Sequence, residues 1–264
     1  MSLLEIKNLY KSFGGLRALS DLSFSVEKGE IVGVIGPNGA GKSTLFNVIT
    51  GVYWVDRGCI TFLERNIVQL PTHEIVRLGI GRTFQSPRVS KSLTVLENTM
   101  IGFHGRTQAG VLDALFRTKR SITEINETAE KALSLLQFVQ LNHRARDLAA
   151  NLAYGEHRRM EIACALATNP RLLLLDEPMA GMSVEEIKNI SRVIESIRTS
   201  GVAVLLIEHN MRVAMELCER MVVLNFGSKI AEGDPKDIKN NAAVIEAYLG
   251  LAGESHNRGM LDAS

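Results

Sequence analysis

The residues with the clearest chemical potential form a short glycine-rich segment after an apolar run. They match the pattern G-x-x-x-x-G-K-[ST], in which glycines let backbone N–H groups come close to phosphate oxygens. The lysine supplies a mobile positive charge, and the hydroxyl after it is a ligand for Mg²⁺. The segment consists of Gly36, Pro37, Asn38, Gly39, Ala40, Gly41, Lys42, Ser43 and Thr44.

This segment lies where a predicted strand meets a predicted helix. Residues 31–35 are Ile-Val-Gly-Val-Ile, which is typical of a strand buried on both faces, and residues 43–50 are predicted to be helical. The helix N-terminus would add unpaired N–H donors and partial positive charge beside the phosphates. A glycine-rich turn with a chance lysine is disfavoured, because the motif lies at the junction that it needs to work. The sequence therefore predicts a nucleotide phosphate loop, or P-loop.

Two carboxylates follow a second apolar run. Residues 172–175 are four leucines, and Asp176 and Glu177 come at the C-terminal end of this predicted strand, where open α/β sheets bind ligands. We expect Asp176 to hold Mg²⁺ through water and Glu177 to polarise the attacking water as a general base. Taken alone, Asp-Glu after a strand is more often a solvated turn. The P-loop makes catalysis the favoured interpretation.

The elements that must position these residues alternate along the chain. Polar helix formers dominate from about 89 to 149, and residues 121–140 repeat apolar side chains at helical spacing. Strands alternating with helices predict an α/β fold with a mainly parallel sheet. The predicted strands are 3–8, 22–26, 31–35, 171–176, 202–207 and 221–224, and the later helices are 156–168, 184–199 and 210–218.

The composition excludes several other classes of protein. The chain has 264 residues, 45% hydrophobic and 22% charged, and its net charge of +1 gives no support for binding nucleic acid. No apolar stretch approaches the roughly 20 residues of a membrane helix, and no signal sequence begins the chain. The three scattered cysteines predict reduced, structural thiols, as in a cytosolic protein.

Three further segments resemble those of ATP-binding cassette (ABC) ATPases. Residues 151–159 resemble the family's LSGGQ signature, 81–85 resemble its Q-loop, and 205–209 resemble the strand end that carries its switch histidine. A P-loop and an acidic strand end alone also fit kinases, GTPases and helicases. Each fragment is weak alone, but all five occur in the family's order between about residues 4 and 250.

The resemblance implies further roles around ATP and Mg²⁺. Gln85 would bond Mg²⁺-bound water and a moving loop, and His209 would sense the γ-phosphate and hold the attacking water with Glu177. Phe13 falls where the family stacks an aromatic ring on adenine, although a place in the core is an equally open reading. Ser183 lies in the D-loop, where many relatives have aspartate.

The signature segment departs from the family pattern. In the family, two ATPase subunits sandwich ATP head to tail, and this segment of one subunit touches the γ-phosphate held by the other. Here Ala153 replaces the serine, Tyr154 the first glycine and Glu156 the glutamine, whereas Gly155 matches. Because Ala153 has no hydroxyl, we expect backbone N–H groups near Gly155 to make the contact. The alternative is a helix N-terminus with no ligand.

A finer resemblance is to the G-type ATPase of bacterial branched-chain amino acid importers. It is carried by residues 80–85, 93–98, 152–155, 207–211 and 246–250, and LAYG in place of LSGG is typical of that group. It implies an ATPase of the P-loop fold with an N-terminal antiparallel β-subdomain and a helical insert. The implied partners are a second ATPase subunit, membrane permeases and, indirectly, a periplasmic solute-binding protein, with the chain at the inner face of the cell membrane.

The same resemblance sets the expected domains and leaves alternatives open. Residues 1–85 and 156–250 would form the ATPase core, 86–155 the helical subdomain and 251–264 a tail. The candidate surface for a membrane subunit is formed by Gln85 and residues 86–105. The alternatives are ATPases for lipopolysaccharide export or for urea and amide uptake, and, less favoured, a non-transport ABC ATPase.

Overall fold

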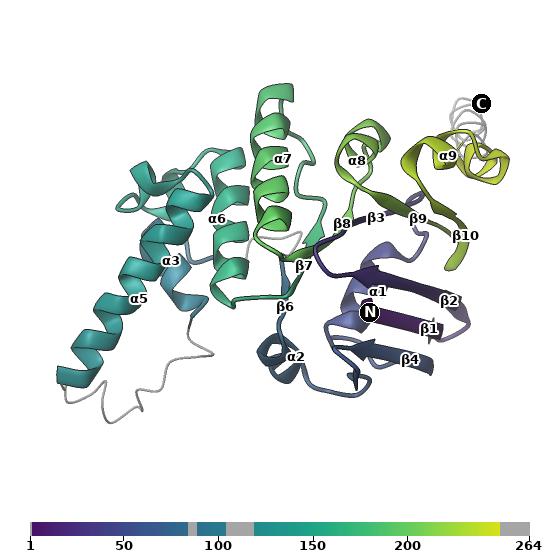
Figure 1. Cartoon of the computed structure of the whole chain (residues 1–264), viewed down its shortest axis with the longest axis horizontal. Helices are drawn as coiled ribbons and strands as arrows, with labels where there is room; N and C mark the ends of the chain where they lie inside the picture. Colours follow the sequence, from purple (N-terminus) through teal and green to yellow (C-terminus); the bar gives the residue numbers. More distant parts are fainter. Residues whose placement is uncertain (1, 84–88, 104–118, 249–264) are drawn as a thin grey trace, which may run out of the picture.

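The structure is a computed structural model that describes residues 2–83, 89–103 and 119–248, with the side chains of 119–122 left aside. The described residues form two β-sheets with helices packed around the larger one (Figure 1). The predicted fold is confirmed: an antiparallel N-terminal sheet, a mainly parallel core sheet and a helical region all occur. None of the described helices is long and apolar enough to cross a membrane.

The N-terminal sheet is antiparallel and longer than predicted. Strands β1 (Ser2–Phe13) and β2 (Leu16–Glu27) form a hairpin that turns at Gly14, whose φ is 58°. The strands run past the predicted ranges 3–8 and 22–26, because their pairing continues to the end of the hairpin. Strands β4 (Arg57–Phe62) and β5 (Arg65–Asn66) complete the order β2-β1-β4-β5.

The second sheet carries the predicted parallel strands. Its strands are β3 (Ile31–Ile35), β6 (Ile80–Arg82), β7 (Leu172–Asp176), β8 (Ala203–Ile207), β9 (Arg220–Asn225) and β10 (Ser228–Gly233). Their order is β10-β9-β3-β8-β7-β6, with only β10 antiparallel to its neighbour. The sequence did not predict β4, β5, β6 or β10, which are edge strands or short strands with exposed positions.

Both faces of the parallel sheet are buried. In β3, Ile31 and Ile35 belong to one apolar cluster, whereas Val32 and Val34 belong to the other. A central strand covered on both faces has no solvent side, so its sequence is a continuous apolar run. The first cluster includes residues of α6 (Tyr154–Ala167), α7 (Val184–Thr199) and α8 (Met211–Leu217), and the second those of α1 (Lys42–Ile49) and the antiparallel sheet.

The predicted insert is a helical region at one end of the molecule. Helices α3 (Val95–Ile101) and α5 (Lys119–Phe138) pack against each other and against α6, away from the antiparallel sheet (Figure 1). Of the predicted apolar stripe on α5, Ala132 and Leu136 are fully buried, but Ile125 and Leu133 are exposed. The stripe therefore faces solvent over part of its length in this single chain.

Short elements complete the fold. Helix α2 (Thr72–Leu78) precedes β6, two 3₁₀ turns, η2 (Asn142–Arg144) and η3 (Ala149–Asn151), follow α5, and α9 (Pro235–Lys239) follows β10. Residues 242–248 are also helical. The proposed division at residues 85/86 and 155/156 stays a prediction, although α6, which begins at Tyr154, spans the second boundary.

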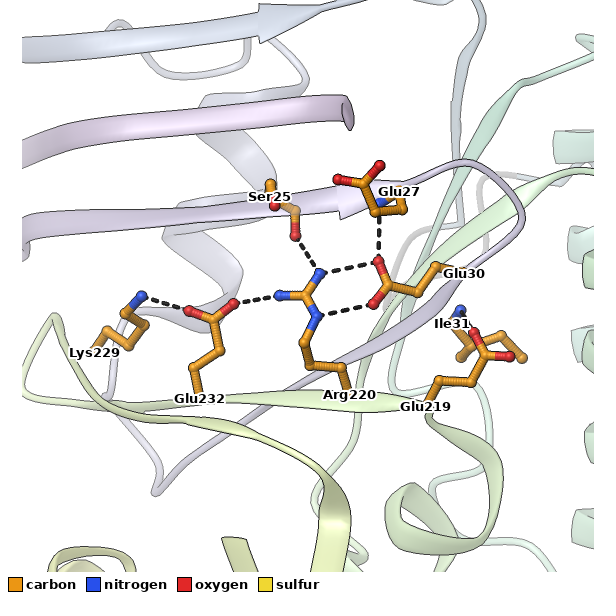
Figure 2. A network of polar contacts seen from close by, with 8 residues as sticks. All are labelled: Ser25, Glu27, Glu30, Ile31, Glu219, Arg220, Lys229 and Glu232. Atoms are coloured by element: carbon orange, nitrogen blue, oxygen red, sulfur yellow. Dashed lines mark hydrogen bonds and ion pairs between the residues drawn. The ribbon is translucent and has the colours of Figure 1, made fainter. Parts of the chain in front are cut away.

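A network of charged groups ties the two sheets together at the N-terminal ends of β3 and β9. Arg220 donates from Nε to Glu30 Oε1 at 2.8 Å, from one terminal nitrogen to Glu30 Oε2 at 2.9 Å, and to the Ser25 carbonyl at 2.7 Å (Figure 2). It also pairs with Glu232, which binds Lys229. The guanidinium thus connects β2, β9 and β10, and the pairs lie at the sheet edge opposite the P-loop.

Candidate nucleotide site

The predicted chemical residues gather at one edge of the parallel sheet. Strands β3, β7 and β8 are parallel neighbours, and their register sets Val34 and Asp176 each beside Ile207. Their C-terminal ends therefore lie together, as the general rule for open α/β sheets requires. The P-loop leaves β3, the two carboxylates leave β7, and Glu208 and His209 leave β8.

The P-loop has the backbone that its glycines allow. Gly36, Gly39 and Gly41 have φ of 146°, 79° and 102°, all in the region that side chains rarely adopt. A Cβ at Gly36 would lie 2.1 Å from the Leu224 carbonyl oxygen, and one at Gly41 would lie 2.5 Å from that of Ala18. At Gly36 and Gly41, conformation and space together exclude larger residues, and Gly41 is the N-cap residue of α1.

Lys42 is buried within its own loop. Its Nζ donates to the carbonyls of Gly36 at 2.6 Å and Pro37 at 2.9 Å. Burial lowers the pKa of this ammonium, while the carboxylates of Glu177 and Asp176 act in the opposite direction. Both bonds are to neutral oxygens of the loop. The charge of Lys42 is therefore held at the loop and is paired with no carboxylate within hydrogen-bonding distance in the described residues.

A cleft of about 570 Å³ lies over the P-loop. Phe13 is 42% exposed in its wall and meets Tyr53 edge to face, with ring centroids 5.0 Å apart. The alternative that Phe13 fills the core is therefore wrong. The cleft is lined by Phe13, Leu16, Arg17, Ala18, Asn38, Gly39, Ala40, Gly41, Lys42, Ser43, Thr44, Glu177, His209 and Phe226.

Asp176 lies deep at the end of β7. Its Oδ2 accepts a bond from Arg82 at 3.1 Å, whereas its buried Oδ1 has no hydrogen-bond partner in the described part of the chain. Burial raises the pKa of this carboxyl, and the Arg82 guanidinium opposes that effect. A buried carboxylate oxygen without a partner is suited to a cation or to its bound water.

Glu177 and His209 meet across the ends of β7 and β8. His209 Nε2 lies 2.6 Å from Glu177 Oε1, and both side chains line the cleft. Glu177 has a φ of 50°, which is uncommon for a residue with a side chain, and its N–H donates to the Ile207 carbonyl at 3.0 Å. The backbone thus turns sharply after Asp176 and directs two adjacent carboxylates to different places.

Sequence reasoning missed two charged groups of the site. The sequence gives Arg82 only a place in the Q-loop segment and Glu208 only a place at a strand end. Glu208 is 3% exposed and accepts a bond from Met179 N–H at 3.1 Å. Burial raises its pKa to about 7. A carboxylate or guanidinium next to an apolar run was the available signal for both residues.

The signature residues lie at the N-terminus of α6 and are not among the residues that line the cleft. Ala153 N–H donates to Glu156 Oε2 at 2.9 Å, and Arg144 Nε donates to Glu156 Oε1 at 3.1 Å. The backbone N–H of Gly155 helps to lower the pKa of the Glu186 carboxyl, and a Cβ at Gly155 would lie 2.8 Å from Glu186 Oε1. In this single chain the Gly155 N–H faces a carboxylate, as a helix N-terminus favours, and its contact with a partner's phosphate stays a prediction.

Tyr154 and Ser183, which differ from the residues typical of the family, both make contacts within the fold. Tyr154 Oη accepts a bond from Arg158 at 3.0 Å, and its ring centroid lies 5.3 Å from the guanidinium carbon. Ser183 caps α7, with its Oγ accepting from Glu186 N–H at 3.3 Å. Gln85 and residues 86–88 lie outside the described residues.

Comparisons with known proteins show which family has these features. The family model described as "ABC transporter" matches residues 19–180, and the model described as "Branched-chain amino acid ATP-binding cassette transporter" matches 228–252. The high-affinity branched-chain amino acid transport ATP-binding protein LivG of Salmonella typhimurium is 41% identical, covering 95% of this chain and 98% of that protein. The lipopolysaccharide export system ATP-binding protein LptB of Haemophilus influenzae is 37% identical, with the same coverage of 95% and 98%.

Solved structures agree with the sequence comparison. The ADP conformation of MJ1267, an ATP-binding cassette of an ABC transporter, has a TM-score of 0.83 at 35% identity, covering 95% of this chain and 99% of that one. The dimeric structure of MJ0796, a bacterial ABC transporter cassette, has a TM-score of 0.75 at 25% identity, covering 88% and 98%. With the P-loop and acidic strand end at one sheet edge, these matches show that the chain belongs to the ABC transporter family of ATP-binding proteins.

Proposed function

We propose that this chain is the ATP-binding and ATP-hydrolysing subunit of an ABC importer for branched-chain amino acids. The observation that carries the proposal is the convergence of a P-loop, Asp176, and the Glu177–His209 pair on one sheet edge in a member of this family. Each group matches a task in phosphoryl transfer: holding phosphate, holding metal and orienting water.

The nucleotide would lie in the cleft with its phosphates in the P-loop. Backbone N–H groups of residues 36–44 and the Lys42 ammonium would hold the β- and γ-phosphates, and the adenine would lie against Phe13. Ser43, Asp176 and Gln85 would hold Mg²⁺, directly or through water. The described residues contain no group of three or more His, Cys, Asp or Glu side chains that could hold a metal, so phosphate oxygens and water would supply most of the ligands.

The hydrolysis step would be carried by Glu177 and His209. When bound, Mg²⁺ neutralises charge that builds up on the phosphate oxygens. Glu177 accepts a proton from the attacking water as its oxygen bonds to the γ-phosphorus, and the bond to the β-phosphate oxygen breaks. His209, 2.6 Å from Glu177 Oε1, keeps that carboxylate and the water in place. The products are ADP and inorganic phosphate.

A second ATPase subunit would complete the site. The residues at the start of α6, Ala153, Gly155 and Glu156, do not line the cleft of their own chain, so they would face the γ-phosphate held by a partner. The dimeric structure of the MJ0796 cassette supports such an arrangement. Because the Glu186 carboxylate lies beside Gly155, it would have to move when phosphate arrives.

Similarity to LivG supports the transported solute and the remaining partners. The relative named for branched-chain amino acids is 41% identical against 37% for the lipopolysaccharide exporter, and the matching C-terminal model also names branched-chain amino acids. The chain would bind permeases at the inner face of the cell membrane, and a periplasmic binding protein would supply the solute. Residues 89–103 form the described part of the surface proposed for the permease.

Three measurements test this function. The purified chain should hydrolyse ATP in the presence of Mg²⁺, and Lys42→Ala should weaken ATP binding by roughly 10- to 100-fold, because a charge-assisted hydrogen bond is lost. In the source cells, deletion of the gene should abolish uptake of radiolabelled leucine, isoleucine and valine, and the wild-type gene but not Lys42→Ala should restore it. Normal amino acid uptake with a defect in urea uptake or lipopolysaccharide export would assign one of the alternatives.

A further inference from the structure

Arg82 links two halves of the nucleotide site that are far apart in the sequence. It is the last residue of β6, which pairs with β7, and its side chain is only 7% exposed. One terminal nitrogen donates to Asp176 Oδ2 at 3.1 Å. The other donates to Asn47 Oδ1 in α1 at 2.7 Å and to Thr50 Oγ1, directly after α1, at 3.1 Å.

The shape of the guanidinium makes this arrangement specific. A planar fork can donate in two directions at once, whereas an ammonium is a point charge with no fixed fork. The Arg82 guanidinium carbon also lies 5.5 Å from the centroid of the Phe46 ring, which limits its rotation. Arg82 is therefore held by α1 on one side, and Asp176 receives its bond from a donor with a fixed direction.

The bond also selects which oxygen of Asp176 stays available. Oδ2 is taken by Arg82, whereas the buried Oδ1 has no partner in the described residues. If Arg82 merely neutralised a buried charge, any cation would serve and its contacts with Asn47 and Thr50 would be incidental. The anchored fork instead fixes the plane of the carboxylate relative to α1, the helix that starts at the P-loop.

We propose that Arg82 is a positioning residue that orients the Asp176 carboxylate toward the Mg²⁺–nucleotide complex, using α1 as its fixed support. The inference rests on the proposed function, in which Asp176 holds Mg²⁺. Residues that orient a metal ligand typically change metal affinity by 10- to 100-fold when they are removed. Arg82 would act in this way through Asp176 and would touch neither the metal nor the phosphates.

The test measures binding of a fluorescent ATP analogue to the full chain, first in EDTA and then across a Mg²⁺ titration. Arg82→Gln should leave the affinity in EDTA unchanged and shift the Mg²⁺ midpoint upward by roughly 10- to 100-fold. Arg82→Lys should show most of that loss, because it keeps the charge but not the fork. Asn47→Ala should shift the midpoint in the same direction by less, since it removes one support of Arg82.

Two controls separate this idea from a loss of fold or of function. Arg220→Gln removes a similarly paired arginine from the opposite edge of the sheet, so it should lower the melting temperature without moving the Mg²⁺ midpoint. Asp176→Asn should abolish the effect of Mg²⁺. If wild type and Asp176→Asn do not differ, the metal role in the proposed function fails. If they differ but Arg82→Lys or Asn47→Ala matches wild type, or Arg82→Gln binds Mg²⁺ more tightly, only the positioning role is overturned.

Discussion

Two arginine–carboxylate clusters lie at opposite edges of the same parallel sheet, one where its parallel strands begin and one where they end. Arg220 begins β9 at the N-terminal edge, and Arg82 ends β6 at the C-terminal edge. At the first edge both oxygens of Glu30 accept bonds from one guanidinium, and Glu232 is paired twice (Figure 2). At the second edge Asp176 gives one oxygen to Arg82 and keeps a buried oxygen without a partner in the described residues.

This difference in hydrogen bonding distinguishes carboxylates that stabilise the fold from those that are available to a ligand. A carboxylate whose oxygens are all bound by a neighbouring cation has little left to offer a ligand, whereas a buried oxygen without a partner is costly and is expected mainly where a ligand repays that cost. Glu208 at this edge does have partners, since backbone N–H groups hold its carboxylate, but burial still raises its pKa to about 7. In the proposed function, the same residue types would thus serve stability at one edge and reaction at the other.

Glu177→Gln should produce the largest change. If Glu177 takes the proton from water, the amide of the replacing glutamine cannot do so. The rate of hydrolysis should therefore fall by roughly 10²- to 10⁴-fold, the range for loss of a general base. ATP binding should persist, because the P-loop is untouched. Steady-state phosphate release and equilibrium binding of the ATP analogue measure the two properties separately.

Glu30→Gln is the matched control at the other edge. It replaces the same residue type beside Arg220 and should lower the thermal midpoint while leaving the rate per folded molecule unchanged. Should Glu177→Gln retain full turnover, the general-base role is rejected. If Glu30→Gln slows hydrolysis as strongly as Glu177→Gln does, the assignment of one edge to stability and the other to hydrolysis is wrong.

The C-terminal ends of the parallel strands were predicted well from the sequence, because these strands have strong local signals. Strands β3, β7 and β8 are continuous apolar runs that end at glycines or at charged residues, so burial on both faces and the strand ends were visible together. The P-loop and Asp176–Glu177 followed from these ends. The ABC family is confirmed, while the roles of individual site residues stay predictions.

The short strands and the long-range contacts of the site could not be predicted, because they depend on residues that are far apart in the sequence. Strand β6 is three residues long and β10 alternates weakly, so pairing with neighbours defines both. Arg82 meets Asp176 only because β6 and β7 are adjacent, although 94 residues separate them in the sequence. Glu186 reaches Gly155 for the same kind of reason, because the first turn of α7 lies beside the first turn of α6.

Arg220→Gln should have the next largest effect, and on stability alone. It leaves Glu30 and Glu232 without their shared cation in a partly buried place, so the free energy of unfolding should fall by about 2–3 kcal/mol, less than for a fully buried pair. Urea unfolding followed by circular dichroism gives this value. A loss below about 0.5 kcal/mol, the level of an ordinary surface substitution, would show that the network does little for the scaffold.

Glu208→Gln should have the smallest effect, and it should depend on pH. Burial raises the pKa of Glu208 from 4.5 to about 7, so its contribution to stability is fully present below pH 4.5 and is lost as the pH rises through 7. Glutamine cannot ionise and escapes this loss. Between pH 5 and 7 the wild type should therefore lose about 2 kcal/mol of unfolding free energy relative to the variant.

Urea unfolding of both proteins at pH 5, 6, 7 and 8 measures this difference, and each series uses one ionic strength. The gap should open mainly between pH 5 and 7 and change little above pH 8, where the carboxyl is ionised in both folded and unfolded protein. Parallel stability curves would mean that Glu208 ionises as easily in the folded chain as in the unfolded one. Ionising Glu208 would then carry no extra free-energy cost in the folded protein. The contrast between the two edges would rest on Asp176 alone.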